Sequence, residues 1–540
     1  MIIRFNTVSA RVRLASLSIV TIAVAAFSMA TASADGGTGQ WWPMAGQNID
    51  DTRFQAAEHA ISPRTVSSLT PQWTATLSGA VATTPTVYKG VVYVPDFGGR
   101  LSAFDTDGKV LWSRSVSSYT GVAGDVSRTS PAVYGNELIL GDQWILSSTP
   151  SGARVFAVDR HTGNLLWVTK VDSNPAAIIT GSPTIYKGVA FVGISAKEEA
   201  LFPPPGTSRG AVIAINATTG KLLWKTYTVP SNNNNNDVNL PGYYSGNAVW
   251  ASSPAIDPGR GLLYIGTGNN YTVPTGVCTT VGQIGCAPPA SNDYVDSILA
   301  LSLTSGSVVW SVRALSSDVW TFAVPLGQDF DFGSGANLFR TTNPSTGRSE
   351  QLLGIGEKSG VYWAVDPGTG KVVWQTAIGP GGLNGGLEWG SATDGKRIYV
   401  AEAGTSNEPY TLGGSGPFAG KTVKGGSWAA LDPATGKILW QTPDPQGAFD
   451  TGFISAANGV VYAGSLASTG NNMYALDART GNILWGFASG GSVSGGAAIV
   501  HGAVYWGSGY CGAACVVAGT PLINNNKLDA FTLTKEEDHS

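Results

Sequence analysis

A short motif that ends in tryptophan recurs along most of the chain and constrains its fold more than any other feature. Each copy joins an apolar strand that contains Ala to a second strand that ends in Trp, through a turn with Asp or an equivalent residue followed by Thr-Gly or Asp-Gly. The Gly supplies the positive φ that a tight hairpin requires, and the Asp side chain can accept backbone N–H groups of the turn. Seven copies end at Trp112, Trp167, Trp224, Trp310, Trp374, Trp440 and Trp485. We expect these tryptophans to pack between adjacent sheets.

A second pair of strands precedes most copies, as in SPTIYKGVAFVG (182–193) and SPAIDPGRGLLYIG (253–266). Each unit is therefore interpreted as four antiparallel strands. Residues 527–534 resemble the first motif strand without a Trp strand after it, and residues 69–77, with Trp73, resemble a Trp strand with nothing before it. Pairing these two ends completes one more unit and removes an open sheet edge. We predict an all-β, eight-bladed β-propeller of four-stranded antiparallel blades, closed by its N- and C-terminal strands.

The N-terminus has the layout of a cleaved secretory signal. Basic residues Arg4, Arg11 and Arg13 precede an apolar run at 14–26, which is followed by Ala-Ser-Ala at 32–34. We predict a signal peptide at 1–34, a single propeller domain at 35–540, and a periplasmic or secreted protein. Because each blade packs only on its neighbours, a repeat fold escapes the size limit of a single core.

Charge and cysteine content narrow the choice of partners. Charged residues make up 13% of the chain and the net charge is −4, which argues against nucleic acid or anionic membrane as a partner. No C-x-x-C-H motif occurs in the sequence, so we expect no covalent c-type haem. Local spacing in an exported chain predicts the disulfides Cys278–Cys286 and Cys511–Cys515.

The motif A-x-D-x-x-T-G-x-x-x-W resembles the repeat of alcohol dehydrogenases that depend on pyrroloquinoline quinone (PQQ), and most nearly that of the polyvinyl alcohol dehydrogenases. The resemblance covers nearly all of the predicted mature chain. A non-catalytic outer-membrane assembly lipoprotein has the same repeat and binds no cofactor, so an exported scaffold that binds other proteins remains an alternative. The residues between the repeats must decide between the two.

PQQ is a flat ortho-quinone with three carboxylates, so its site needs cations, a stacking surface and a metal that polarises the reactive carbonyl. Residues that match the family's cofactor contacts lie in five segments: VAGDVSRTSP, ITGSPTIYKGVAFVGISAKEEA, NAVWASSPAID, YIGTGNN and EKSGVYWAVD. The resemblance implies that PQQ is bound by Arg128, Thr180, Ser195, Trp250 and Lys358. It implies that calcium (Ca2+) is bound by Glu198, Asn269 and Asp331.

Each match also has a structural interpretation. Glu198 and Lys358 could be solvated charges, Asn269 a turn residue, Arg128 a salt-bridge partner and Trp250 part of the core. All of them lie outside the motif, where side chains from successive blades can converge on the axis. A carboxylate, an amide oxygen and a second carboxylate form the kind of set that calcium prefers.

The general base departs from the family pattern, in which an Asp follows a Trp. Here the matching residue is Trp320, and Thr321 follows it. We assign the base to Asp331 in DFDFGSGANL, with Asp329 and Asp318 as alternatives.

Two further features also differ from the family. Gly124 and Asp125 replace an adjacent cysteine pair, and Ala82 replaces a cofactor-binding Glu. The resemblance implies an enzyme that oxidises alcohols with PQQ and calcium, including secondary alcohols of a polymer such as polyvinyl alcohol. Asp331 would remove the hydroxyl proton and Lys358 would stabilise the developing negative charge. Without a haem of its own, the chain would pass electrons to an external acceptor such as a cytochrome c.

Overall fold

The computed structural model describes residues 40–143, 151–200, 207–230, 244–250, 253–274, 276–278, 286, 290–321, 328–382, 385–510, 516–517, 520–521 and 524–534. The predicted signal peptide and the predicted Cys511–Cys515 disulfide lie outside the described residues. The predicted disulfide between Cys278 and Cys286 is confirmed.

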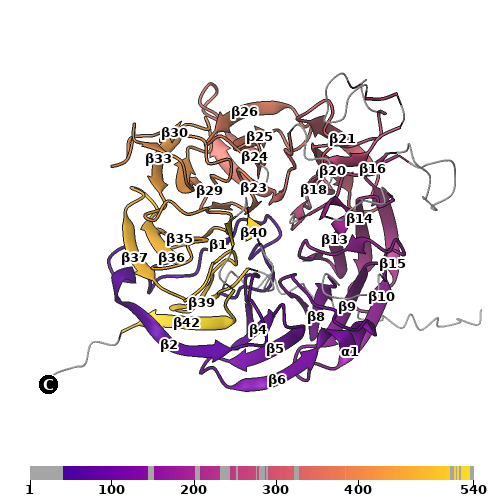
Figure 1. Cartoon of the computed structure of the whole chain (residues 1–540), viewed down its shortest axis with the longest axis horizontal. Coiled ribbons are helices and arrows are strands. Elements are labelled where there is room, and N and C mark those ends of the chain that lie inside the picture. Colours follow the sequence, from indigo (N-terminus) through magenta and orange to yellow (C-terminus); the bar gives the residue numbers. More distant parts are fainter. Residues whose placement is uncertain are drawn as a thin grey trace, which may run out of the picture. The chain divides into compact units, whose positions relative to one another are not determined.

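Eight four-stranded antiparallel sheets follow one another around a ring, which confirms the predicted eight-bladed propeller (Figure 1). The first strand of each sheet lies toward the centre and the fourth lies on the outside. Blades 1 to 4 consist of β3 (Thr86–Tyr88), β4 (Val91–Pro95), β5 (Arg100–Asp105) and β6 (Val110–Ser115); β7 (Ala132–Tyr134), β8 (Glu137–Gly141), β9 (Arg154–Asp159) and β10 (Leu165–Lys170); β12 (Thr184–Tyr186), β13 (Val189–Ala196), β14 (Ala211–Asn216) and β15 (Leu222–Tyr227); β17 (Ala255–Asp257), β18 (Leu262–Gly266), β20 (Ser297–Ser302) and β21 (Val308–Arg313).

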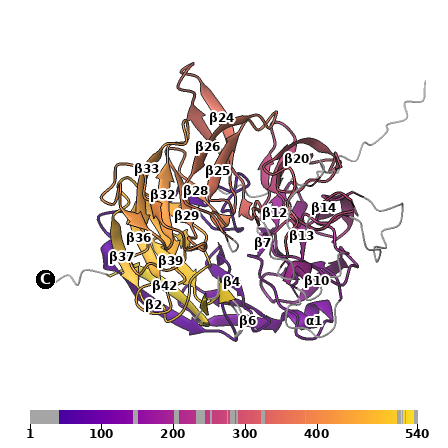
Figure 2. The same ribbon diagram turned by 45° about the horizontal axis from the view of Figure 1, so that its top comes forward.

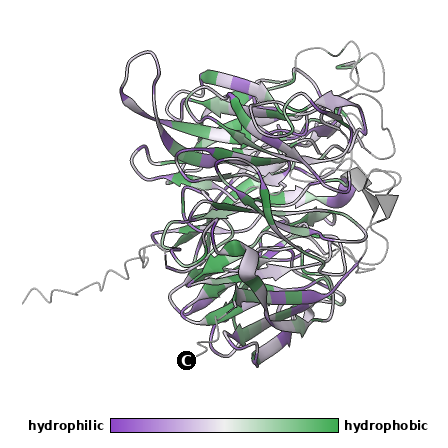
Figure 3. Ribbon diagram, turned by 90° about the vertical axis from the view of Figure 1, so that its left-hand side faces the viewer, coloured by the Kyte–Doolittle hydropathy of each residue, from purple (hydrophilic) through white to green (hydrophobic). Residues whose placement is uncertain are grey.

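The second half of the ring repeats this plan. Blades 5 to 8 consist of β23 (Asn337–Thr342), β24 (Ser349–Gly356), β25 (Val361–Val365) and β26 (Val372–Ala377); β28 (Ala392–Thr393), β29 (Ile398–Glu402), β32 (Ser427–Leu431) and β33 (Ile438–Pro443); β34 (Ser455–Ala457), β35 (Val460–Gly464), β36 (Met473–Asp477) and β37 (Ile483–Phe487); β38 (Ala498–Val500), β39 (Ala503–Gly507), β42 (Lys527–Leu533) and β2 (Leu69–Thr76). Figure 3 shows hydrophobic stretches along these strands and hydrophilic stretches at several hairpin ends.

Shorter elements lie between the blade strands. Five pairings involve β11 (Ala177–Ile178) with β13, β16 (Ser245–Gly246) with β19 (Asn270–Thr272), β22 (Ser334–Gly335) with β27 (Trp389–Gly390), β30 (Tyr410–Thr411) with β31 (Thr422–Val423), and β40 (Val516–Val517) with β41 (Thr520–Pro521). The helices of the described residues are α1 (Val116–Thr120), η1 (Val66–Ser68) and η2 (Lys197–Ala200). None of them has the length and hydrophobicity that a bilayer span requires.

The motif tryptophans join each blade to the next. Within a blade the motif Ala is paired with the motif Trp, as Ala157 is with Trp167. A bulge lies in the Trp strand between Leu165 and Trp167. The Trp ring then lies on the turn of the next blade: Trp112 donates its indole N–H to the Arg160 carbonyl at 3.0 Å. A Cβ added to Gly163 of that turn would lie 2.5 Å from the Trp112 ring, so only Gly fits there. The predicted packing of the tryptophans between sheets is confirmed.

The ring is closed as predicted, by β2 and β42. Trp73 is paired with Ala530, and Pro71 with Phe531. Figure 1 shows the indigo β2 beside the yellow β42. Trp73 also donates to the Thr106 carbonyl of blade 1 at 2.8 Å, so the contact between blades continues across the closure.

Residues 42–55, to which the sequence assigned no role, run along the first strands of the blades. They hydrogen-bond to blades 1, 2, 4, 5, 6, 7 and 8, through Val87 N–H to Trp42 O, Val133 N–H to Pro43 O, Ile256 N–H to Ile49 O, Leu338 N–H to Asp50 O, Thr393 N–H to Thr52 O, Ala456 N–H to Arg53 O, and Gln55 Nε2 to Ile499 O. Within this stretch β1 (Phe54–Gln55) pairs in parallel with β34. The innermost strands would otherwise have unsatisfied backbone groups at their free edges.

We predict that Arg53→Met lowers the free energy of unfolding by about 3 kcal/mol, because it leaves buried acceptors without donors. Arg53 is 1% exposed and donates to Ile454 O at 2.8 Å, Ala45 O at 2.8 Å and Thr84 Oγ1 at 2.7 Å. Urea denaturation should show the loss, whereas the exposed Arg64→Met should unfold like the wild type. Equal urea midpoints for the two variants would show that the bonds of Arg53 in residues 42–55 add little to stability.

Candidate active site

The candidate residues come from loops at one end of the blades. In an antiparallel blade, the turn between strands two and three and the connection to the next blade lie at the same end, opposite the motif turns. Lys358 lies between β24 and β25, Asn269 follows β18, and Asp331 lies in the connection from blade 4 to blade 5. Blades that share one axis therefore bring these loops toward one place.

The structure brings Asn269, Asp329, Asp331 and Lys358 together, and we call them the Lys358 cluster. Lys358 Nζ donates to Asp331 Oδ2 at 2.8 Å and to Asp329 Oδ1 and Oδ2 at 3.0 and 3.1 Å. The backbone N–H of Asn269 donates to Asp331 Oδ1 at 2.7 Å. Lys358 is 8% exposed and Asp331 is fully buried. Both oxygens of Asp331 are thus held in fixed directions.

The side-chain amide of Asn269 is only partly satisfied by the described residues. Its Nδ2 donates to the carbonyls of Trp320 at 2.7 Å and Asn270 at 3.0 Å. Its Oδ1 is buried and has no hydrogen-bond donor among the described residues. A buried polar atom without a partner is costly, and a metal ion or a ligand donor would satisfy it.

Further buried carboxyls surround the cluster. Asp318 Oδ2 accepts the N–H of Phe330 at 3.0 Å, which positions the segment that carries Asp331. Burial raises the pKa of Asp318 to about 7, and the charge of Asp331 adds to this effect. Burial and the neighbouring Asp318 raise the pKa of Asp296 well above its ordinary value. Burial also raises the pKa of Glu357 to about 7. These acids therefore retain protons toward neutral pH.

An aromatic and cationic group lies beside this cluster. The guanidinium carbon of Arg128 lies 4.0 Å from the ring centroid of Trp389 and 5.9 Å from that of Tyr510. Trp389 is paired with Ser334 through β27 and β22, three residues beyond Asp331. It has a φ of 56°, a strained value for a bulky residue.

Glu388 connects the aromatic group electrostatically to the Lys358 cluster. Burial raises the pKa of Glu388 to about 7, whereas the charges of Lys358 and Arg128 lower it. Arg128 in the aromatic group and Lys358 in the Lys358 cluster therefore both lower the pKa of the same carboxyl.

Thr180, Ser195 and Trp250 form a third group. The hydroxyls of Thr180 and Ser195 lie 2.8 Å apart, and Thr180 donates to the Trp250 carbonyl at 2.5 Å. The Trp250 ring packs against Val122 and Ile178, and also against Ala196, Ala248 and Tyr271. Its indole N–H, like that of Trp389, is buried without an acceptor in the described part of the chain.

Glu198 has different hydrogen-bond partners from the other predicted calcium ligands. It is fully buried, and its carboxylate accepts the N–H and hydroxyl groups of Thr207 and Ser208 at 2.6 to 3.0 Å. These bonds occupy most of its lone pairs. In the described residues, its hydrogen bonds all come from this pair rather than from the Lys358 cluster.

Most of the positions that depart from the family pattern are buried. Ala82 is buried with Ala80, Phe97 and Val126. Gly124 has a φ of 73° and the neighbouring Asp125 is 1% exposed. Thr321 is buried beside Trp320.

Sequence reasoning missed five residues around the site, namely Asp296, Glu357, Glu388, Trp389 and Tyr510. A usable signal existed for Trp389, which is a tryptophan outside the motif position and within a Gly-rich connection. The buried acids carry no comparable pattern.

Glu357 provides a test of these buried acids. Its pKa rises from 4.5 unfolded to about 7 folded, so unfolding releases a proton between those pH values and the folded state loses stability as pH rises. We predict that Glu357→Gln reduces this loss by up to about 1.4 kcal/mol per pH unit, with no further difference above pH 7. Urea denaturation at stepped pH measures it. The exposed Glu408→Gln should keep the wild-type slope, and an unchanged slope for Glu357→Gln would show that this carboxyl is ionised throughout.

Comparisons with known proteins agree with this fold. The chain is 29% identical to polyvinylalcohol dehydrogenase of Sphingopyxis sp. (strain 113P3), over 94% of this chain and 78% of that protein. It is 27% identical to quinohemoprotein alcohol dehydrogenase ADH IIB of Pseudomonas putida, over 83% of this chain and 69% of that protein. The quinohemoprotein alcohol dehydrogenase of Comamonas testosteroni has the same fold, with a TM-score of 0.69, 19% identity, and coverage of 94% and 82% of the two chains.

Family models match two stretches of the sequence. Residues 424–527 match the model of outer membrane protein assembly factor BamB. Residues 42–380 match the PQQ model for the β-propeller domain of glucose, ethanol and alcohol dehydrogenases. This second match spans more than half of the 540 residues. The chain therefore belongs to the family of PQQ-dependent, or quinoprotein, alcohol dehydrogenases.

Proposed function

We propose that this chain is an exported dehydrogenase that uses PQQ and calcium to oxidise alcohols, and that its substrates are secondary alcohols of a polymer such as polyvinyl alcohol. The observation that carries the proposal is the Lys358 cluster, in which a buried lysine holds two aspartates next to an amide oxygen that has no donor among the described residues. The polymer substrate is suggested by the names of the relatives from Sphingopyxis and Pseudomonas.

The residues around the cluster fit a flat anionic cofactor. Arg128 provides a cation for its carboxylates, Lys358 provides one for its quinone oxygens, and the hydroxyls of Thr180 and Ser195 provide polar contacts. The indole N–H groups of Trp250 and Trp389 are buried donors without acceptors in the part of the chain that the structure describes, and a quinone or carboxylate oxygen would satisfy them. Trp250 is the proposed stacking floor. When bound, PQQ supplies the hydride acceptor and calcium polarises its reactive carbonyl.

A hard cation fits beside Asn269 and Asp331. The Oδ1 of Asn269, which accepts no hydrogen bond from the described residues, and the carboxylate of Asp331 are oxygen ligands of the kind that calcium prefers. Glu198 could join them only by giving up bonds to Thr207 and Ser208, so its role as a calcium ligand stays a prediction. Asn269 and Asp331 are the ligands that the geometry favours.

The chain's own groups can move the substrate proton. Asp331 is assigned as the base that accepts the hydroxyl proton, because its two oxygens are fixed by Asn269 and Lys358. Lys358 counters the negative charge that develops nearby. Asp329 shares the same lysine and remains the second choice. Asp318 is bonded to the Phe330 N–H, which makes it a positioning residue.

We propose that electrons leave to a separate protein, such as a cytochrome c. The sequence contains no C-x-x-C-H motif for a covalent haem. One relative is named lupanine 17-hydroxylase [cytochrome c], of a Pseudomonas species, which fits such a partner. The signal at 1–34 would place the single propeller domain, 35–540, in the periplasm or outside the cell.

We predict that Asn269→Ala raises the calcium concentration needed for half-maximal activity at least about tenfold, because it removes one of the proposed oxygen ligands. Dye-linked oxidation of propan-2-ol in calcium titrations with saturating PQQ measures this. Glu198→Gln is expected to lower the calcium-dependent activity and Glu199→Gln to change it little. Equal losses of activity for Glu198→Gln and Glu199→Gln would show that Glu198 is not the specific calcium ligand. An unchanged calcium requirement for Asn269→Ala would show that Asn269 does not bind calcium.

We predict that the purified chain with PQQ and calcium reduces an artificial dye with secondary alcohols or polyvinyl alcohol as substrate, and consumes no oxygen at a matching rate. Adding a soluble cytochrome c should replace the dye. Oxygen uptake as fast as dye reduction would exclude the need for a partner protein. If neither dye nor cytochrome is reduced, the scaffold alternative, which the match of residues 424–527 to BamB favours, becomes the better account.

A further inference from the structure

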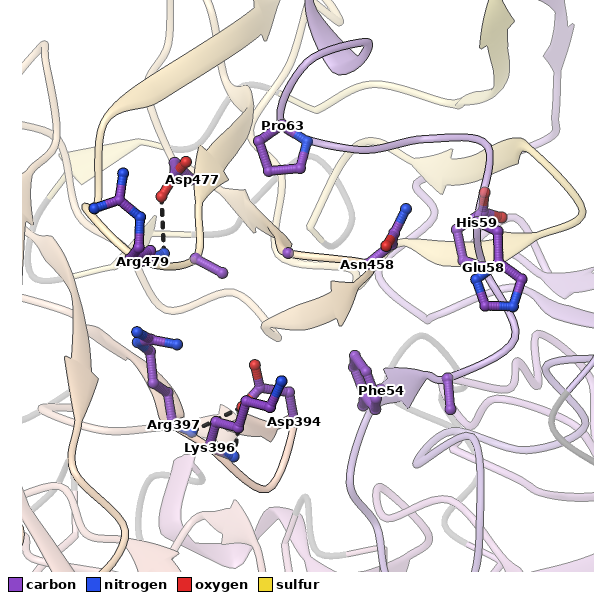
Figure 4. Close-up of a pocket in the computed structure, with 13 residues that line it drawn as sticks. Phe54, Glu58, His59, Pro63, Asp394, Lys396, Arg397, Asn458, Asp477 and Arg479 are labelled. Atoms are coloured by element: carbon purple, nitrogen blue, oxygen red, sulfur yellow. Dashed lines mark hydrogen bonds between the residues drawn. The ribbon is translucent and has the colours of Figure 1, made fainter.

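A hollow of about 380 Å3 lies between blades 6 and 7, at the end of the ring opposite the Lys358 cluster. Its walls include the turn between β28 and β29, the turn between β34 and β35, and the motif turn between β36 and β37. These turns lie at the opposite end of each blade from the turn that carries Lys358. The N-terminal segment forms the remaining wall with Phe54, Ala56, Glu58, His59 and Pro63 (Figure 4). The hollow is thus separate from the candidate active site.

The N-terminal wall is fixed in place. Asn458 Nδ2 donates to the Ile61 carbonyl at 2.9 Å. Glu58 is 2% exposed, and its two oxygens accept the N–H groups of Ala60, Ile61 and Gly502 at 2.7 to 2.9 Å. The hollow therefore exists before any ligand binds, which lowers the entropic cost of binding.

The acidic side chains of the hollow are occupied by the protein itself. Asp394 accepts the N–H groups of Lys396 and Arg397 and the hydroxyl of Tyr399. Asp477 accepts the N–H groups of Arg479 and Thr480. Glu58 is occupied as described above. The carboxylate oxygens of the hollow thus already accept hydrogen bonds from the turns and from the N-terminal wall.

The basic side chains, by contrast, keep their charged groups available. Lys396, Arg397 and Arg479 form no ion pair with a carboxylate in the described part of the chain. Arg397 hydrogen-bonds to the Tyr399 hydroxyl, and its Nε is buried without an acceptor among the described residues. Figure 4 shows Arg397 and Arg479 on the same side of the hollow, from two different blades. Two guanidinium groups without a carboxylate partner among the described residues favour a ligand that brings anionic oxygens.

We propose that this hollow binds a small ligand with anionic oxygen groups, a phosphate or a dicarboxylate, through Arg397 and Arg479. Arg397 donates from the blade 6 turn and Arg479 from the blade 7 turn, so the ligand connects the two blades. Lys396 adds charge at the rim. A volume of about 380 Å3 admits a small molecule rather than a folded partner. This site is independent of the proposed dehydrogenase function, since it uses none of its residues.

Isothermal titration calorimetry of the full chain with inorganic phosphate and with malonate, at constant ionic strength, tests the proposal. Saturable binding of one or both anions is expected, and the anion that binds identifies the ligand class. Arg397→Gln and Arg479→Gln should each weaken it at least about tenfold, because a charge-assisted hydrogen bond is lost.

Arg348→Gln is the matched control, since Arg348 is an exposed arginine in the same kind of turn in blade 5 and outside the hollow. It should bind like the wild type. Arg479 is exposed, so its substitution should leave the thermal unfolding unchanged and keeps the test valid if Arg397→Gln folds poorly. Absence of saturable binding by both anions, or equal weakening by Arg348→Gln, would overturn the proposal.

Discussion

The contact of a motif tryptophan with the next blade's turn glycine is the interaction on which the whole ring depends. It occurs in every blade except the seventh, whose Trp485 donates to the Leu69 carbonyl instead. It places a large apolar ring where no other side chain fits, and it adds one indole hydrogen bond, as between Trp112 and the Arg160 carbonyl. Because the same contact recurs from blade to blade, it sets a constant spacing and tilt between neighbouring sheets. Figure 2 shows the resulting succession of blades from a second direction. Stability and geometry are thus determined by the same residue pair.

The site chemistry uses the end of the blades that this contact leaves free. Motif turns are restricted to short sequences with Gly, whereas the loops at the other end have no such requirement. Asn269, Asp331 and Lys358 come from those loops, and Arg128 and Trp389 approach from other blades. A rigid repeat at one end therefore supports a polar, irregular and partly strained site at the other.

Sequence predicted the parts of this fold that are local and periodic. The Ala–Trp pair and its turn lie within a dozen residues, so eight blades and the closure by Trp73 could be counted directly. Residues 42–55 could not be placed, because they bond mainly through backbone groups, which no side-chain pattern reports. The contact of Arg128 with Trp389 joins distant segments in the same way. Glu198 matched the family register, yet its bonds to Thr207 and Ser208 depend on a loop that has no periodicity.

The path of residues 42–55 determines when this protein can become a complete ring. The segment hydrogen-bonds to strands of blades 1 and 2 and also to strands of blades 7 and 8. Strand β2 can pair only with β42, which lies more than 400 residues later in the sequence. These contacts span most of the sequence, so they form late and slowly compared with the hairpins of each blade. Until residues 527–533 have been synthesised, the last blade lacks its third strand and exposes the edges of β39 and β2. A growing or truncated chain is consequently a set of finished hairpins with open edges, and protection from aggregation has to come from outside the molecule during that interval.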